Sequence, residues 1–99
     1  MGLEGTDNLD SVAMQELRAV QEKIGEAWPV GTTDILEQRN PDLLRELGKI
    51  QGVINSIIAI PNWPTPIKKQ WRDALAEYEK TAMLCVTYAN RHLPQEAVL

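Results

Sequence analysis

Residues 66–93 read PIKKQWRDALAEYEKTAMLCVTYANRHL, the longest uninterrupted helical pattern in the chain. Thr65 is a suitable N-cap, Pro66 suits the first helical position, and Pro94 ends the pattern. Between these signals apolar residues recur every three or four positions, which places them on one face of an α-helix. These residues are Ile67, Trp71, Ala74, Leu75, Tyr78, Ala82, Cys85, Ala89 and Leu93. We therefore predict a long helix here and build the rest of the fold around it.

Two more amphipathic patterns precede this helix. The first begins at a cap at Asp7 or Asn8 and ends before Pro29. The second covers residues 41–60 and opens with an Asn-Pro pair, a cap followed by a proline at the first helical position. A short helical turn over residues 34–39 is predicted between them.

These patterns predict an all-α fold. No alternating strand pattern and no repeat is present, and three amphipathic helices joined by short turns favour an up-down-up bundle. The expected architecture has three long helices and a short extra helical turn between the first and second. The 99 residues correspond to a single helical domain over residues 1–99. Residues 1–6 are expected to be a loose leader and residues 94–99 a frayed tail.

Composition limits the class of protein, its compartment and its possible partners. Hydrophobic residues make up 43% of the chain and charged residues 24%, as in ordinary globular proteins. No apolar run approaches the roughly 18 residues that a membrane span needs, so no membrane contact is expected. One cysteine excludes an internal disulfide, and we expect a cytoplasmic protein. The net charge of −4 argues against a nucleic-acid backbone as the main partner.

The predicted helices carry more apolar residues than a single three-helix seam requires. Met83 and Leu84 fall outside the apolar stripe of the last helix, on opposite flanks. The second long helix shows the same excess at Val53 and Ile60. This excess indicates a surface that another protein covers.

A ridge of small residues, Gly48, Gly52 and Ser56, lies on the side of the second long helix away from its apolar stripe. Each glycine inside a helix costs about 1 kcal/mol relative to alanine. Such a ridge lets another helix approach closely, which favours a self-association or partner surface. Alternatively, it packs the 34–39 turn against the same helix, or it is surface without a role.

Trp63 lies between two prolines in the connection before the last helix. Such a tryptophan either folds back onto the end of the bundle as a plug or stands out as an anchor for a partner. The sequence leaves both interpretations open. The candidate partner-binding residues are therefore Gly48, Gly52, Ser56, Met83, Leu84 and Trp63.

A basic cluster opens the last helix, where Lys68, Lys69 and Arg72 could hold a phosphate or nucleic acid at the helix N-terminus. The competing interpretation is pairing with Asp7 and Asp10, which an up-down-up bundle brings to the same end.

Catalytic chemistry has little support. His92, the only histidine, follows Cys85 by two turns, and Cys85 lies on the core face, so a Cys-His pair is not expected. The carboxylates fall on solvated faces rather than in facing pairs that could hold a metal. No phosphate-binding, zinc-protease or serine-hydrolase motif occurs. We predict no catalytic residue, no metal and no cofactor.

The leading hypothesis is a non-enzymatic small helical interaction or regulatory protein. It would dock a helix face onto a protein partner and associate with itself as a homo-oligomer. The first alternative is a binder of an anionic ligand or nucleic acid through the basic helix N-terminus. The second alternative is a metal-dependent enzyme that uses helical carboxylates.

Overall fold

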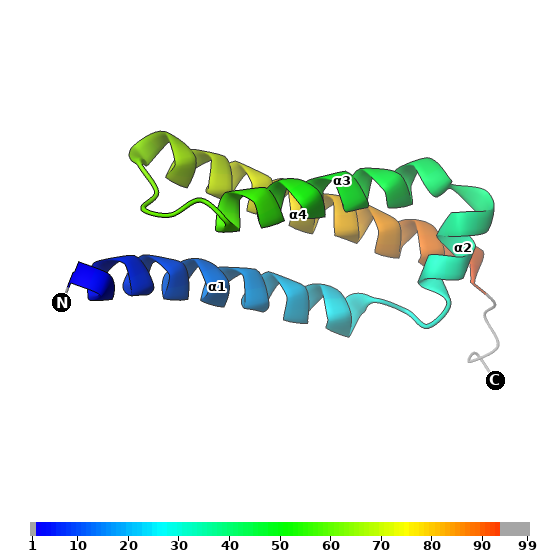
Figure 1. Ribbon diagram of the computed structural model, residues 1–99. Coiled ribbons are helices and arrows are strands. Elements are labelled where there is room, and N and C mark those ends of the chain that lie inside the picture. The colour runs from blue at the N-terminus through cyan, green and yellow to red at the C-terminus, as the bar shows by residue number, and fades with distance from the viewer. Residues whose placement is uncertain (1, 94–99) are drawn as a thin grey trace.

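The computed structural model describes residues 2–93, with side chains from Val12 onward. This part of the chain contains four helices, α1 (Gly2–Ala27), α2 (Thr32–Arg39), α3 (Pro41–Ile58) and α4 (Thr65–His92), and no strand. Three long helices run up, down and up, and the short α2 lies between the first two (Figure 1). The predicted all-α bundle is confirmed.

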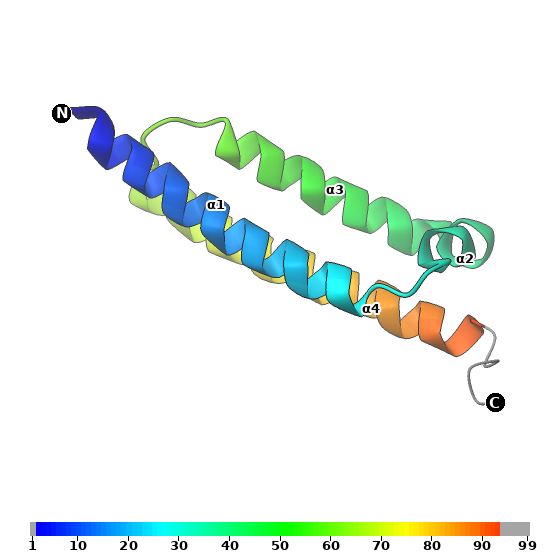
Figure 2. The ribbon, with the colours of Figure 1, turned by 90° about the horizontal axis from the view of Figure 1, so that it is seen from below.

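Helix α4 is the centre of the bundle. Both α1 and α3 pack along it, but α1 and α3 have almost no direct contact with each other. Figure 2 shows α1 lying against α4 while α3 stands apart from α1. The buried residues of α4 are Trp71, Ala74, Tyr78, Thr81, Ala82, Cys85, Val86 and Ala89. The face predicted from the spacing in residues 66–93 is therefore the face that carries the core.

The other elements complete this core mainly with aliphatic side chains and one tryptophan, because the chain contains no phenylalanine. Leu36 of α2 is completely buried, and Trp63 closes the end of the bundle from the α3–α4 connection. The buried residues contributed by α1 and α3 are Ala13, Leu17, Ile24, Leu47, Ile54 and Ile57. All six belong to the helical spacing of their segments.

The boundaries around α2 follow from local chemistry. The Asn40 side chain accepts a hydrogen bond from the backbone N–H of Leu43 at 3.3 Å, which confirms the cap before Pro41. Gly31 has a φ of 91°, a left-handed conformation that favours glycine. The sharp turn at Gly31 lets α2 begin at Thr32, two residues before the predicted turn at Asp34.

The start of α1 differs from the prediction. The helix begins at Gly2 and not at the cap at Asp7 or Asn8, so residues 2–6 are helical rather than a loose leader. Leu3 and Glu4 are good helix formers, and an acidic residue in the first turn is favoured by the helix dipole. The expected tail, residues 94–99, lies outside the described residues.

The start of α4 also differs, because Pro64 and not Thr65 is the N-cap. Pro64 is extended, and its carbonyl accepts hydrogen bonds from the backbone N–H groups of Ile67 and Lys68 at 3.0 and 3.1 Å. Thr65 consequently lies inside the first turn. Helix α3 ends at Ile58, two residues before the predicted end. From residue 2 to residue 93, no helix is long and apolar enough to cross a membrane.

Candidate functional site

A groove opens between α1 and α3, because both helices pack on α4 and have almost no direct contact with each other. It consists of two adjoining hollows of about 280 and 630 Å³ that share Gln21, Gln51 and Tyr78. The smaller hollow is also lined by Leu17, Ile54 and Asn55. The larger one is also lined by Ile24, Gly25, Trp28, Leu44, Leu47 and Gly48. We call this feature the α1–α3 groove.

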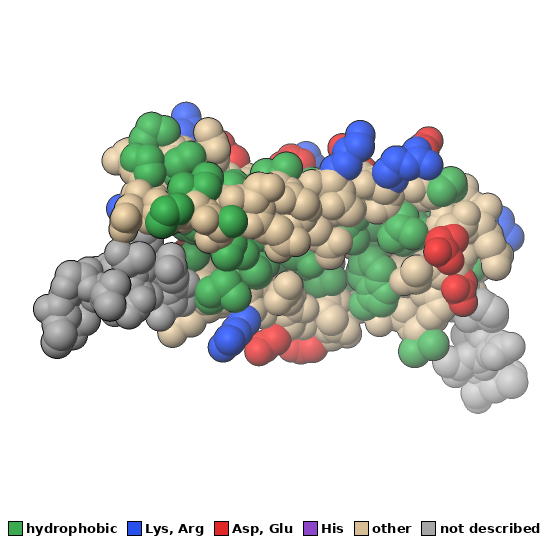
Figure 3. Space-filling view, in the orientation of Figure 1, with side chains coloured by type: hydrophobic (Ala, Val, Ile, Leu, Met, Phe, Trp, Pro, Cys, Tyr) green, Lys and Arg blue, Asp and Glu red, His purple; other side chains and the backbone are tan. Residues whose placement is uncertain are grey.

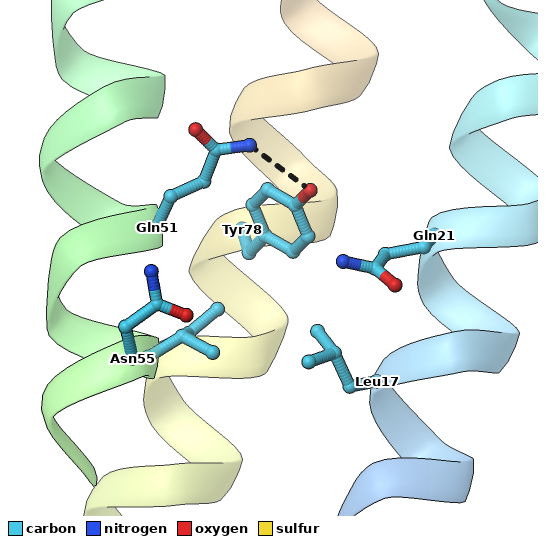
Figure 4. A pocket seen from close by; sticks show the side chains of 6 residues that line it. Leu17, Gln21, Gln51, Asn55 and Tyr78 are labelled. Carbon is cyan, nitrogen blue, oxygen red and sulfur yellow. Dashed lines mark hydrogen bonds between the residues drawn. The ribbon is translucent and has the colours of Figure 1, made fainter. Parts of the chain in front are cut away.

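The middle of the groove is polar but uncharged. Tyr78 of α4 forms the floor, and its hydroxyl oxygen accepts a hydrogen bond from the side-chain amide of Gln51 at 3.3 Å. Figure 4 shows Gln51 and Asn55 approaching from α3 and Gln21 from α1. Amide side chains both donate and accept hydrogen bonds. The centre of the groove therefore suits a neutral polar group.

The rest of the groove is apolar. Ile24 and Leu47 are buried in its walls, and Trp28 and Leu44 are half-buried. Hydrophobic side chains are visible in the hollow between α1 and α3 in the space-filling view (Figure 3). Aliphatic walls beside a few polar groups are typical of grooves that receive an amphipathic helix.

The small-residue ridge borders this groove. Gly48 lines it, while Gly52 and Ser56 continue the ridge along the exposed side of α3. A Cβ atom added at either glycine would meet nothing within 4 Å. Helix α2, which contains the predicted 34–39 turn, therefore does not pack on the two glycines, and that interpretation is wrong. Gly25 of α1 is equally open.

Gly48→Ala is expected to raise the free energy of unfolding by about 0.5–1 kcal/mol, because alanine is a better helix former and has room there. Gly31→Ala is the matched control and is expected to lower it by about 1 kcal/mol, because φ is positive at Gly31. Urea denaturation of dilute protein measures both. A loss of stability in Gly48→Ala would show that the ridge is packed.

Met83 and Leu84 do not join the ridge in one surface. Met83 is half-buried and packs against the core, whereas Leu84 is 51% exposed. Leu84 follows Glu77 by two helical turns, and Glu77 lines a different hollow of about 390 Å³ between α3 and α4. Val53, which is 50% exposed, lines the same hollow. The predicted combined surface is thus divided between two sides of the molecule.

Trp63 is a plug. It is 7% exposed, and its indole N–H donates a hydrogen bond to the carbonyl of Ile57 at 3.0 Å. Its ring centroid lies 5.1 Å from that of Trp71. The interpretation of Trp63 as an exposed partner anchor is therefore wrong.

The basic cluster at the start of α4 shares its hollow with a carboxylate. Lys68 and Arg72 line a hollow of about 210 Å³, but Glu16 of α1 lines it too. The Glu16 carboxylate accepts a hydrogen bond from the Trp71 indole N–H at 3.0 Å. A carboxylate in this position repels an anion. The sequence pattern does not indicate this contact, because it joins residues that are far apart in the chain.

The other charged or titratable candidate residues do not join Lys68 and Arg72 in one site. Lys69 is exposed and does not line the hollow of Lys68. Pairing of the lysines with Asp7 and Asp10 lies outside the described side chains. Among the described residues, no group of three or more His, Cys, Asp or Glu side chains could hold a metal ion. The His92 ring packs on that of Tyr88, with centroids 4.5 Å apart.

Cys85 is completely buried, and desolvation by burial raises the pKa of its thiol. Because the thiolate is the reactive form, we expect a thiol reagent to label Cys85 only when the protein unfolds. The unfolded chain loses the thiol proton at a lower pH than the native protein does. Stability should therefore fall as pH rises above the pKa of the unfolded thiol. Labelling rates measured with and without urea test whether folding protects Cys85. Rapid labelling of the native protein would contradict this protection.

Comparisons with family models, with curated proteins and with solved structures found no match for this chain.

Proposed function

We propose that this protein is a non-enzymatic helical interaction protein that receives a helix face of its partner in the α1–α3 groove and also associates with itself. One observation carries the proposal. α1 and α3 pack along α4 but not on each other, so the groove floored by Tyr78 stays uncovered within the subunit.

The dimensions of the groove support a helical partner. From Leu17 to Trp28, the residue that follows α1, this wall of the groove spans twelve residues, about 16 Å or three helical turns. Apolar positions at successive turns of a partner helix would reach the aliphatic walls. A polar side chain of that helix would meet the Gln21 and Gln51 amides.

A small protein of this kind would act by occupying a surface of its partner, so we propose a regulatory or accessory role. We place it in the cytoplasm, where a lone buried thiol such as Cys85 persists in reduced form. No specific observation favours the two alternatives. Anion binding conflicts with Glu16 beside Lys68 and Arg72, and the metal-dependent enzyme lacks a cluster of ligands in residues 12–93.

Photocrosslinking tests the proposal. A photoreactive amino acid is placed at Gln51 in the groove or, as a matched control, at Thr87, an exposed α4 residue outside the groove. We expect discrete protein adducts, to the same chain or to another protein, from position 51 in living cells. Position 87 should give few. Absence of adducts at position 51, or equal adducts from both positions, would contradict docking through the groove.

A further inference from the structure

We propose that a second copy of this chain covers the α1–α3 groove, related to the first by a two-fold axis parallel to the helices. In this arrangement α1 of each copy lies along α3 of the other. The inference rests on the proposed function, because it names the partner that covers the same groove. It is carried by the charges on the exposed faces of α1 and α3, outside the groove lining, and by their heights along the two helices.

The groove shows which residues of α1 and α3 lie at the same height. Leu17 of α1 shares the smaller hollow with Ile54 and Asn55 of α3, whereas Trp28 shares the larger one with Leu44. The two helices are antiparallel, so residue numbers rise along α1 as they fall along α3 (Figure 1).

It follows that Glu22 lies near the height of Lys49, and Glu26 near the height of Arg45. All four side chains are exposed. Glu22 and Glu26 are four residues apart in α1, as are Arg45 and Lys49 in α3, so the two residues of each helix share one helix face. We call the face of α1 with Glu22 and Glu26 the acidic edge and the face of α3 with Arg45 and Lys49 the basic edge. Lys23 and Glu46 are exposed at similar heights but lie roughly 60–100° around their helices from these residues.

Within one subunit these two edges do not pair with each other. Arg45 bonds Asp42 at 2.9 Å in its own helix, and both side chains are largely exposed. The interhelical ion pair seen in residues 12–93 joins Lys23 to Glu79 instead. Glu22, Glu26 and Lys49 are therefore available to another molecule, and Arg45 can exchange its exposed Asp42 partner for one in that molecule.

A two-fold axis parallel to the helices preserves height and places α1 of one copy over α3 of the other. Glu22 then meets Lys49, and Glu26 meets Arg45, in both seams of the dimer. Arg18 lies one turn before Glu22 and would face the uncharged end of the small-residue ridge near Ser56. Complementary charges of this kind fix orientation and register more than affinity.

The other simple arrangement fits less well. A two-fold axis across the helices would lay α3 on the α3 of the second copy. With the ridge of Gly48, Gly52 and Ser56 at the centre of that contact, Arg45 and Lys49 would face uncharged residues, because the carboxylates of α3, Asp42 and Glu46, lie beyond one end of the ridge. The charges thus select the parallel axis.

The glycines suit the same contact. Gly48 and Gly52 would lie under α1 of the second copy, and neither has a neighbour within 4 Å of an added Cβ. Without side chains at these positions the two helices can approach closely. This contact accounts for two glycines inside α3, each of which costs about 1 kcal/mol of helix stability relative to alanine.

Charge reversal tests the arrangement. One variant, Glu22→Lys with Glu26→Lys, makes both edges basic; the other, Arg45→Glu with Lys49→Glu, makes both edges acidic. Each variant alone would repel itself in both seams, so its dimer dissociation constant should rise about tenfold or more. An equimolar mixture has complementary seams and should form a heterodimer. Sedimentation velocity and native mass spectrometry measure both results.

Two further proteins serve as controls. All four changes in one chain exchange the edges and should restore the homodimer even if one double variant is poorly folded. Asp73→Lys with Glu77→Lys reverses two charges at the hollow between α3 and α4 and should leave dimerisation unchanged.

A wild-type protein that stays monomeric at millimolar concentration would overturn the inference. So would double variants that dimerise like the wild type, or a mixture that forms no heterodimer. If adducts to a different protein still form from position 51, the proposed function stands and only the second copy is excluded. If neither adducts nor dimers form, both proposals fail.

Discussion

Trp71→Ala is expected to lower the free energy of unfolding by about 3–5 kcal/mol, as is usual when a buried tryptophan is truncated. Trp71 is 3% exposed and packs on Trp63 of the α3–α4 connection. Its indole N–H also bonds Glu16 of α1. A single side chain therefore joins α1, α4 and the connection that closes this end of the bundle.

Urea denaturation followed by circular dichroism measures this loss. The total stability of a domain this size is about 5–15 kcal/mol, so Trp71→Ala would remove a large part of it. Trp28→Ala is the control. Because Trp28 is only half-buried, its truncation should lower the free energy of unfolding by less. A loss below about 1 kcal/mol for Trp71→Ala would show that this end of the bundle is not packed as described.

Leu36→Ala is expected to lower the free energy of unfolding by about 2–5 kcal/mol. Leu36 is completely buried, and it belongs to α2, which packs against both α3 and α4. Removing its side chain leaves a cavity that only a shift of α2 could fill. The short helix should consequently detach before the long helices unfold.

Ile35→Ala is the matched control, because Ile35 is adjacent in α2 but only half-buried. Denaturation gives the two free energies, and hydrogen exchange of the α2 amides reports its detachment. Equal losses for the two variants, or unchanged α2 exchange in Leu36→Ala, would contradict the described packing.

The fold was largely predictable because helical signals are local. The apolar spacing in residues 66–93 indicated the face of α4 that is buried. The Asn40–Pro41 pair marked the start of α3, and Pro29 marked the region where α1 ends. These signals depend on residues within a few positions of one another.

The α1–α3 groove could not be predicted, because it exists only where two helices of the bundle do not pack against each other. Gln21 and Gln51 lie at the edges of apolar stripes, where spacing alone does not distinguish a bundle seam from an open groove. The same limit explains the division of Met83 and Leu84 from the glycine ridge. Helical spacing gives the face of a residue but not the neighbour that covers that face.

Trp63 shows a different limit. Flanking prolines indicated a rigid connection, but the direction of the side chain depends on the carbonyl of Ile57 and the ring of Trp71. Both partners become available only after α3 and α4 have packed. The Glu16–Trp71 contact is likewise tertiary, and it places a carboxylate beside Lys68 and Arg72 of the basic cluster.

Amide proton–nitrogen spectra of the purified protein, recorded from micromolar to millimolar concentration, test most directly whether the protein associates with itself through the α1–α3 groove. We predict that concentration-dependent shifts concentrate at Gln21, Gly25, Gly48 and Gln51. Spectra that do not change with concentration, or shifts that cluster instead around Val53 and Leu84, would contradict this.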